Sequence, residues 1–412
     1  MANKIILLGP RSGSNVFQHF SESLGNQFAS IDVESVTLDL QAADFQQRLL
    51  SLIQEAPLAV LGFAGIGGMF NIDGKNLWEL SRTPFISFFG DSPAYYPDLH
   101  FMGSNWQFGL YGFPEHVAFR KRLPMNHGFV GVVETPFMLP PLIEKTVDIE
   151  KKMAGKLVFP KTGNSSLKLR NELKESLPRA VFAVWESVAA IIDADLNAVS
   201  HALVCALVEE HIPKLAIDGP FVAKIKLLLV ALLDDYARRL ESELVADVLM
   251  DYPAIVCGNR WEHLNIANRT GTYVPVSDYA YTDQLIADSL AVVHVSPNTS
   301  HGIHDRQLRA IAHGTACLSN RQRFVSDSYN LNDEIVYDFD SDSLRDKIEW
   351  ILANKEEVVR QGMNRAESYK QKFHISNFYD QIGNIAGFIR FANADARPAA
   401  FPDYLAWPPQ LG

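Results

Sequence analysis

SLAVVHVSPNTSHGIHDRQLRAIAHGTACLSN, residues 289–320, is the stretch that decides the predicted fold. It opens with an apolar run, continues through a polar loop and a segment with apolar residues at helical spacing, and closes with a second apolar run after Gly314. Short continuous apolar runs are typical of strands buried on both faces of a parallel sheet, and a helix between two of them gives β-α-β order. The stretch therefore predicts a doubly wound α/β domain.

The same alternation extends over both halves of the chain. Further apolar runs that end in glycine or small polar residues lie at 4–9, 57–65, 84–93, 155–160, 253–261 and 271–276. From about 171 to 249 glycines nearly vanish, and Leu, Ala and Val recur with charged residues at helical spacing. This pattern predicts a helical insertion between the first two strands of the second domain. Its apolar stripe favours core packing, with a homodimer interface as the alternative.

We therefore predict an α/β protein of two Rossmann-like domains that face each other across a cleft. The N-terminal domain spans 1–150, and the second spans 151–374 with the insertion at about 171–249. Residues 375–412 form a C-terminal segment that begins with apolar residues at helical spacing and ends in a Pro- and Ala-rich tail.

Composition and charge limit the class of protein. The 412 residues are 47% apolar, enough for a large core, and 37 basic against 48 acidic residues give a net charge of −11. That balance argues against a general nucleic-acid or anionic-membrane binder. Because the N-terminal apolar run is too short for a signal peptide and no apolar run reaches membrane-spanning length, we expect a cytoplasmic protein without a transmembrane segment. Cys205, Cys257 and Cys317 are widely spaced and odd in number, so we expect buried thiols.

The loop at 296–306 is the main candidate for ligand binding, because open α/β sheets bind ligands at the carboxyl ends of their strands. Asp305 is predicted to cap the following helix, and Gly314 to end it. Backbone amides at the start of that helix, with His304 and Arg306 beside them, make a site for a diphosphate. A zinc site at His301, His304 and Asp305 is disfavoured, since spaced cysteines and a helical HExxH pattern are both lacking.

The stretch 289–320, followed by DEIVYDFDSDSLRDKIEWILANKEEVVRQGMNRAESYKQKF, resembles the C-terminal domain of GT-B glycosyltransferases, group 1-like and most similar to the CgeB-like group. IVCGNRW is similar to the Gly-x-x-Trp element of that group, and PFISFFGDSP resembles a segment of its N-terminal domain. The resemblance implies a hexosyltransferase-like enzyme that moves a sugar from a nucleotide-diphosphate sugar to a protein or glycan acceptor. It also implies that no metal or other cofactor takes part, and that a helix at 375–392 packs back on the first domain.

The resemblance gives the candidate residues their expected roles. Asp91 would be the base for the acceptor, while His304 and Arg306 would stabilise the leaving diphosphate. Weaker candidates for the base are His116, His127 and Glu134. The expected donor-binding residues are Gly258, Trp261, Tyr279, Ser296, Asn298, Thr299, Ser300 and Arg309. The expected acceptor-side residues are Arg11, Ser12, Gly67 and Ser92. The alternatives are that Trp261 is a core residue and that Asp91 is a turn residue, each without a role in the reaction.

Two features of the sequence bear on the reaction. Arg309 occupies the place where many retaining relatives carry a glutamate that contacts the donor ribose, and an arginine would contact phosphate instead. The alternative is that Arg309, like His313, is simply solvated or a partner of the helix C-terminal dipole. DFDSD at 338–342 has the spacing of an Asp-x-Asp metal clamp, but it follows a strand and is expected to be an acidic turn before a helix. Alternative functions are a non-catalytic nucleotide-sugar-binding partner of another glycosyltransferase and a GT-B-like nucleotide-sugar epimerase.

Overall fold

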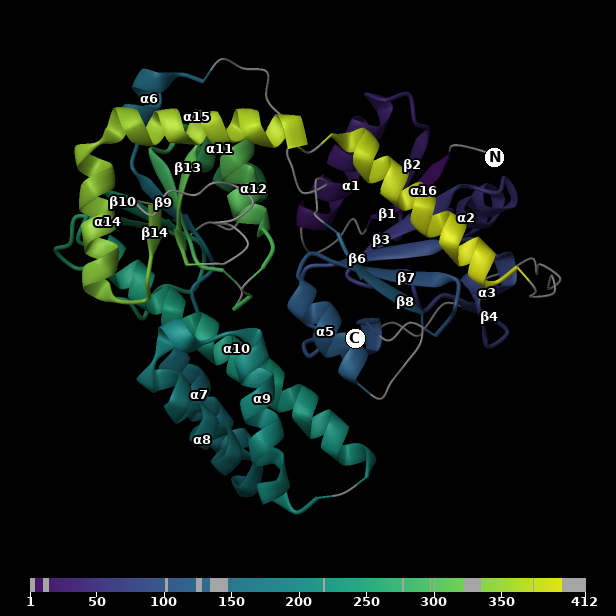
Figure 1. Cartoon of the computed structure of the whole chain (residues 1–412), viewed down its shortest axis with the longest axis horizontal. Coiled ribbons are helices and arrows are strands. Elements are labelled where there is room, and N and C mark those ends of the chain that lie inside the picture. Colours follow the sequence, from purple (N-terminus) through teal and green to yellow (C-terminus); the bar gives the residue numbers. More distant parts are fainter. Residues whose placement is uncertain are drawn as a thin grey trace. The chain divides into compact units, whose positions relative to one another are not determined.

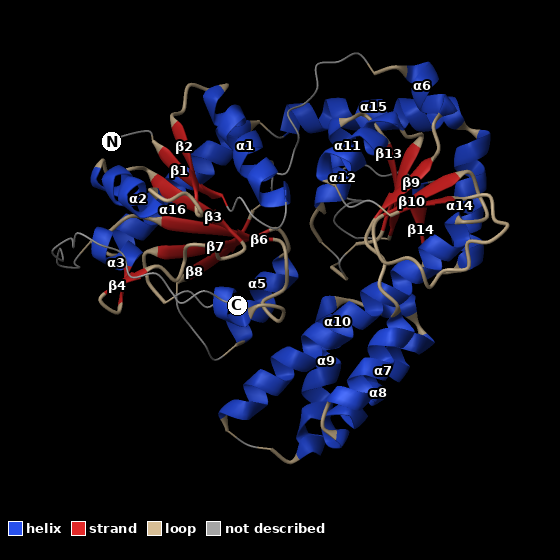
Figure 2. Ribbon diagram, turned by 180° about the vertical axis from the view of Figure 1, so that it is seen from behind, coloured by secondary structure: helices blue, strands red, loops and turns tan. Residues whose placement is uncertain are grey.

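The computed structural model of the chain describes residues 4–9, 15–100, 103–123, 128–133, 147–217, 219–275, 278–296, 298–299, 301–321, 335–372 and 374–394. The chain divides into two compact units, the first made of residues 1–141 and 373–412 and the second of residues 142–372. Each unit contains a six-stranded parallel sheet with helices packed on it (Figures 1 and 2).

The sheet of unit 1 has the strand order β2-β1-β3-β6-β7-β8. The strands are β1 (Ile5–Gly9), β2 (Ser35–Asp39), β3 (Ala59–Phe63), β6 (Phe85–Phe89), β7 (Gln107–Tyr111) and β8 (Phe129–Val132), with β4 (Asn71–Ile72) and β5 (Lys75–Asn76) forming a separate antiparallel pair. The helices between them are α1 (Asn15–Ala29), α2 (Phe45–Gln54), α3 (Leu77–Ser81), α4 (Pro97–His100) and α5 (Pro114–Arg122). Every residue of β1, β3 and β6 is buried, which explains why these strands are mainly apolar, with Ser87 as the one polar residue in β6.

Helix α16 (Ile375–Ala392) belongs to unit 1 although it follows unit 2 in the sequence. Its Phe378 ring lies 6.3 Å from the ring of Phe28 and 5.7 Å from that of Phe88. Arg390 Nη2 donates hydrogen bonds to the carbonyl oxygens of Pro57 (2.9 Å) and Leu58 (2.8 Å). The helix is thus fixed to the sheet of unit 1 by both apolar and polar contacts.

The sheet of unit 2 has the strand order β11-β10-β9-β12-β13-β14. The strands are β9 (Leu157–Pro160), β10 (Ala254–Cys257), β11 (Thr272–Val274), β12 (Ala291–His294), β13 (Ala316–Asn320) and β14 (Val336–Tyr337). The helices around them are α6 (Ile149–Ala154), α11 (Tyr279–Asp288), α12 (Asp305–Ala312), α14 (Ser341–Ala353) and α15 (Lys355–Lys372). All pairs in this sheet are parallel, so the carboxyl ends of its strands lie at one edge.

Between β9 and β10 the chain forms a helical insertion. It consists of α7 (Ser166–Ser176), α8 (Arg179–Ala194), α9 (His201–His211) and α10 (Pro220–Leu249), with 3-10 turns at Leu196–Ala198 and Ile212–Leu215. Figure 1 shows these helices as a bundle that extends beyond the sheet of unit 2. Trp185 on α8 packs edge-on against Tyr236 on α10 inside the bundle, whereas Val245 and Leu249 near the end of α10 join the core of the sheet. The long helix α10 therefore connects the bundle rigidly to the sheet.

The structure bears on two expectations about the whole chain. Cys205, Cys257 and Cys317 are free and buried, as predicted. Among the described residues, no helix combines the length and the apolar character that crossing a bilayer requires.

Candidate functional site

The N-terminus of α12 is capped by His304, so the prediction that Asp305 is the cap is wrong by one residue. His304 Nδ1 accepts a hydrogen bond from the Arg306 backbone N–H (3.3 Å), and Gln307 Oε1 accepts one from the His304 N–H (3.0 Å). This reciprocal pair is a capping box in which an imidazole nitrogen replaces the usual hydroxyl or carboxylate oxygen. At the other end, Gly314 adopts a left-handed φ of 62° directly after the final cap residue, as predicted.

Arg306 joins α12 to the ends of two strands. Its Nε donates to the Pro160 carbonyl (2.9 Å), and its Nη1 lies 2.9 Å from His294 Nδ1. Burial, with the nearby Arg306 charge, lowers the pKa of His294 well below its ordinary value, so the imidazole is neutral and accepts this bond. Within the described part of the chain, only Nη2 of the guanidinium has no partner. Two of the three nitrogens of Arg306 thus hold the fold together.

Asp305 places a carboxylate in the first turn of α12 and contacts His304. Burial opposes its charge, but His304 and Arg306 outweigh burial and lower the pKa of Asp305 below its usual range. The carboxylate is therefore charged at neutral pH. It occupies the helix N-terminus, where a bound anion would gain most from the helix dipole.

Arg309 lies in a buried cluster between α11 and α12. Its Nε donates to Asp283 Oδ1 (2.9 Å), and its guanidinium stacks 3.9 Å from the centre of the Tyr279 ring. Asp283 Oδ2 also pairs with His313 Nε2 at 2.9 Å. Arg309 and Tyr279, both expected to contact a donor, thus interact with each other, and neither lines a pocket of unit 2 that holds other expected donor residues.

That pocket has a volume of about 430 Å³ and lies at the carboxyl ends of β12, β13 and β14, where the helical insertion meets the sheet. Three residues expected to bind a donor, Ser296, Asn298 and Thr299, are part of its wall. The other lining residues are Asn197, Ala198, Val199, Ser200, Glu241, Asn320, Arg321, Asp338 and Phe339.

Hydrogen bonds hold the sheet side of the pocket in place. The Ser296 N–H donates to Asn320 Oδ1 (2.8 Å), and Asn320 Nδ2 donates back to Ser296 Oγ (3.1 Å). These reciprocal bonds link the ends of β12 and β13. Asn298 adopts a left-handed φ of 57°, which asparagine tolerates better than most residues.

The helical insertion forms the opposite wall. Asn298 Nδ2 donates to Asp234 Oδ1 on α10 (2.9 Å), and the Asn298 carbonyl accepts from the backbone N–H of His201 (2.6 Å). Asn197 Oδ1 accepts from the backbone N–H of Phe339 (2.6 Å). The insertion is therefore bonded to the loops that follow β12 and β14, and it closes one side of the pocket.

Two charged groups lie at the exposed side of the pocket and a third lies at its buried side. Arg321 and Asp338 form an ion pair of 3.2 Å whose side chains are 60% and 47% exposed. Glu241 on α10 is 1% exposed. Burial raises the pKa of Glu241 well above its ordinary value, although Lys161 and Arg238 act in the opposite direction.

The remaining expected donor residues have structural contacts. Trp261 is completely buried, and its Nε1 donates to the Lys161 carbonyl (2.7 Å), in agreement with the core interpretation. Gly258 has a φ of 145°, and a Cβ there would clash with the same carbonyl. Ser300 lies outside the described residues.

In unit 1 the expected catalytic and acceptor-side residues are spread over two loops. Asp91 is exposed two residues after the end of β6, and Ser92 is buried with its Oγ accepting from the Ala94 N–H (3.3 Å). The Gly67 carbonyl accepts from Trp78 Nε1 (2.8 Å), so this loop is packed against the core. His116 is buried in α5. Four further candidates fall outside the described residues: Arg11, Ser12, His127 and Glu134.

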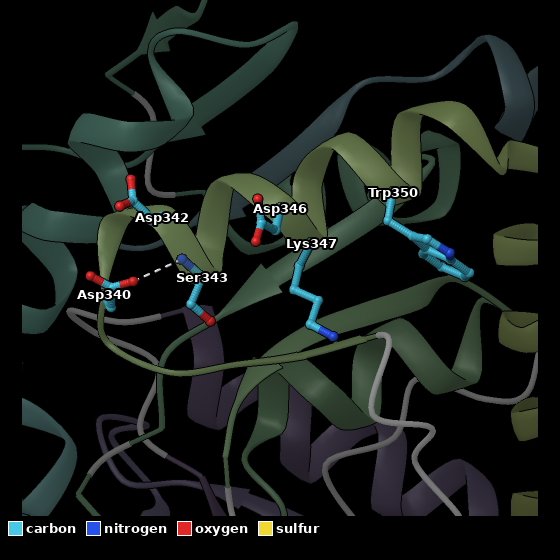
Figure 3. A pocket seen from close by; sticks show the side chains of 6 residues that line it. All are labelled: Asp340, Asp342, Ser343, Asp346, Lys347 and Trp350. Carbon is cyan, nitrogen blue, oxygen red and sulfur yellow. Dashed lines mark hydrogen bonds between the residues drawn. The ribbon is translucent and has the colours of Figure 1, made fainter.

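The acidic stretch at 338–342 leads into α14. Asp340 is the N-cap, and its Oδ2 accepts a hydrogen bond from the Ser343 N–H (2.9 Å; Figure 3). Asp342 and Asp346 line a surface pocket along this helix together with Lys347 and Trp350, as Figure 3 shows. Over the described ranges, no three His, Cys, Asp or Glu side chains are grouped as a metal site would require. Asp340 thus has the capping role that the expected acidic turn implies.

Residues 238–383 match a protein-family model described as glycosyl transferase-like. The matched region begins within α10 and covers β10 to β14, so it includes Glu241 and the sheet side of the pocket. No curated protein matches the chain.

Among solved structures, T4 phage BGT in complex with UDP and Mn²⁺ is similar with a TM-score of 0.52 and 8% identity, over 93% of this chain and 99% of that chain. A DNA-modifying β-glucosyltransferase has a TM-score of 0.48 and 6% identity, over 94% and 99% of the two chains. The spinosyn rhamnosyltransferase SpnG has a TM-score of 0.36 and 10% identity, over 95% and 100%. The similarity to the T4 phage protein confirms the predicted GT-B fold of two Rossmann-like units.

Proposed function

We propose that this GT-B protein, whose residues 238–383 form a glycosyl transferase-like domain, transfers a hexosyl group from a nucleotide-diphosphate sugar to a protein or glycan acceptor. The observation that carries this proposal is the pocket at the ends of β12, β13 and β14, because it lies within unit 2 where open α/β sheets bind ligands.

The pocket suits a nucleoside diphosphate in size and in chemistry. Its volume of about 430 Å³ lies in the range of small-molecule sites. Phe339 is half-buried in the wall and offers a ring on which a base can stack. Asn320 and Ser296 supply amide and hydroxyl groups for hydrogen bonds to the nucleoside. Arg321, at the exposed side, supplies a planar cation for the diphosphate.

Charge stabilisation in the proposed reaction comes from side chains. Arg321 lines the pocket, and Nη2 of Arg306 is a nitrogen of the predicted diphosphate loop that no described residue engages. We propose that these cations stabilise the leaving diphosphate without a divalent metal. Asp91, exposed after β6 in unit 1, is the proposed base for the acceptor hydroxyl or amide.

The acceptor is proposed to be a protein or a glycan. The net charge of −11 disfavours nucleic acid, whose backbone binds proteins through clustered lysine and arginine. Two other functions use the same pocket, namely nucleotide-sugar binding without transfer and epimerisation of the nucleotide sugar.

The proposal is tested by thermal-shift measurements with UDP first, since the similar T4 phage structure contains UDP, and then with UDP-, GDP-, dTDP- and CMP-sugars. A ligand that raises the melting temperature is then incubated with the protein alone and with candidate acceptors. Donor hydrolysis or sugar transfer supports the proposal. Binding without turnover indicates the non-catalytic role, and conversion to another nucleotide sugar indicates an epimerase. If none of these ligands stabilises the protein, the proposed function is wrong.

A further inference from the structure

Glu241 is a buried carboxyl group to which the described part of the chain offers no hydrogen-bond partner. It lines the pocket from α10 and is 1% exposed, yet neither of its oxygens bonds to any described residue, and Oε2 is a buried atom. Asn298 Oδ1 lies in the wall of the same pocket and is also buried without a partner. Buried polar atoms in native proteins are almost always paired, and an unpaired carboxyl group costs folding free energy. Two such atoms at one pocket indicate a ligand that pairs with them.

The surroundings of Glu241 favour its neutral form. The charged and titratable groups around it are Lys161 after β9, Asp234 and Arg238 on α10, Tyr337 on β14, and Arg321 and Asp338 at the exposed side of the pocket. None of them forms a hydrogen bond or ion pair with the Glu241 carboxyl group, so no cation compensates a negative charge there directly. Burial raises the pKa of Glu241, Lys161 and Arg238 oppose the rise, and Asp234 adds to it.

Resting on the nucleotide site proposed above, we propose that Glu241 binds the ligand as a neutral carboxyl group, donating one hydrogen bond and accepting another. A protonated carboxyl group presents a donor and an acceptor side by side. It complements a ligand edge on which an acceptor adjoins an N–H, as on a nucleobase. The contact that recognises the nucleobase would then come from the helical insertion, whereas the sheet supplies the hydroxyl and amide groups of the pocket wall.

This role predicts a definite pH dependence. If only the protonated form binds, the affinity is constant below the raised pKa of Glu241 and falls about tenfold per pH unit above it. Glutamine also presents a donor and an acceptor, at every pH. Glu241→Gln therefore keeps the ligand contact and loses this pH dependence, whereas Glu241→Ala loses the contact.

The experiment is calorimetric titration of the full chain with UDP, GDP, CDP and dTDP, followed by a pH series from about 5.5 to 8.5 with the tightest binder. Wild type, Glu241→Gln, Glu241→Ala and the control Glu210→Gln are compared, since Glu210 is an exposed carboxylate on α9 outside the pocket. We expect wild type and control to lose affinity at high pH, Glu241→Gln to hold its affinity, and Glu241→Ala to bind more than about tenfold more weakly at low pH. Ligand-free Glu241→Gln should melt at or above the wild-type temperature.

Several results overturn the inference. Equal binding by Glu241→Ala and wild type removes Glu241 from the contact. A loss of affinity in Glu241→Gln at every pH, with wild type insensitive to pH, means that the charged form binds. A melting temperature of Glu241→Gln several degrees below wild type makes Glu241 a structural partner of Lys161. If wild type binds none of the four nucleotides, the proposed nucleotide site fails, and this role of Glu241 fails with it.

Discussion

Replacing Arg321 by alanine should weaken nucleotide binding and leave the fold almost unchanged. In the ligand-free protein Arg321 pairs with Asp338, but the two side chains are 60% and 47% exposed, and an ion pair in such a position contributes at most about 1 kcal/mol to stability. A charge-assisted contact with a diphosphate is worth about 1.5–3 kcal/mol, which is roughly 10- to 150-fold in Kd. The variant should thus lose affinity without a comparable loss of melting temperature.

The assay is calorimetric titration with the nucleoside diphosphate that binds wild type most tightly, beside thermal unfolding without ligand. Arg360→Ala is the matched control, because Arg360 is also an exposed arginine paired with a carboxylate, Glu357, on α15. Its affinity should equal that of wild type. Unchanged affinity in Arg321→Ala refutes the contact with the diphosphate, and so does an equal loss in both variants.

The remaining predictions concern the core, the α11–α12 cluster and the role of metal. Gly163→Ala should lower the melting temperature by several degrees, because the added Cβ would clash with the buried Trp261 ring; a wild-type melting curve contradicts this packing. Burial opposes the charge of Asp283, but His313 and Arg309 outweigh burial and lower the pKa of Asp283. The cluster therefore stabilises the fold at pH values above the ordinary aspartate pKa of 3.8, and this stabilisation is lost as the pH falls through the lowered pKa. Asp283→Asn should therefore reduce the acid sensitivity of unfolding, measured as the melting temperature from pH 6 to pH 2, and an unchanged profile speaks against the cluster. Transfer activity should survive EDTA, and activity that EDTA abolishes and manganese restores would refute metal independence.

The sheets can be predicted from the sequence because a strand that is buried on both faces consists of neighbouring apolar residues. Strands β1, β3 and β6 are wholly buried, and each appears in the sequence as a short, mainly apolar run, with Ser87 as the one polar residue in β6. The helical insertion is equally visible, since helices of a bundle repeat apolar residues at helical spacing over long segments. Gly314 could be placed because a helix end needs a left-handed residue, which favours glycine.

The sequence does not show which residues pair with one another in the fold. Arg309 and Arg306 are both arginines of one helix after the predicted ligand-binding loop, but the structure pairs the first with Asp283 and the second with Pro160 and His294. Asp283 lies 26 residues from Arg309, and His294 and Pro160 lie 12 and 146 residues from Arg306, so only the folded chain brings these partners together. The sequence favours Asp305 as the cap because aspartate is a preferred N-cap residue, and His304 gives no distinguishing signal.

The pocket could be predicted only in part, for the same reason. Ser296, Asn298 and Thr299 follow β12, and the rule that ligands bind at the carboxyl ends of strands finds them. The same rule applied to the residue after Asn320 would have found Arg321. Glu241 sits in the middle of a helical pattern, and nothing in its neighbours indicates that α10 carries it to the edge of the sheet.

The most direct test of the proposed nucleotide site is to fill the pocket. Ala198 is an exposed residue of its wall, so Ala198→Trp inserts a large ring without disturbing the core, and Ala353→Trp at the exposed end of α14 is the control. Nucleotide-sugar binding and turnover are measured for both variants, with ligand-free melting curves to verify the fold. We predict that Ala198→Trp melts like wild type but neither binds nor consumes the donor, while Ala353→Trp does both. Wild-type donor binding by a correctly folded Ala198→Trp would contradict the placement of the donor in this pocket.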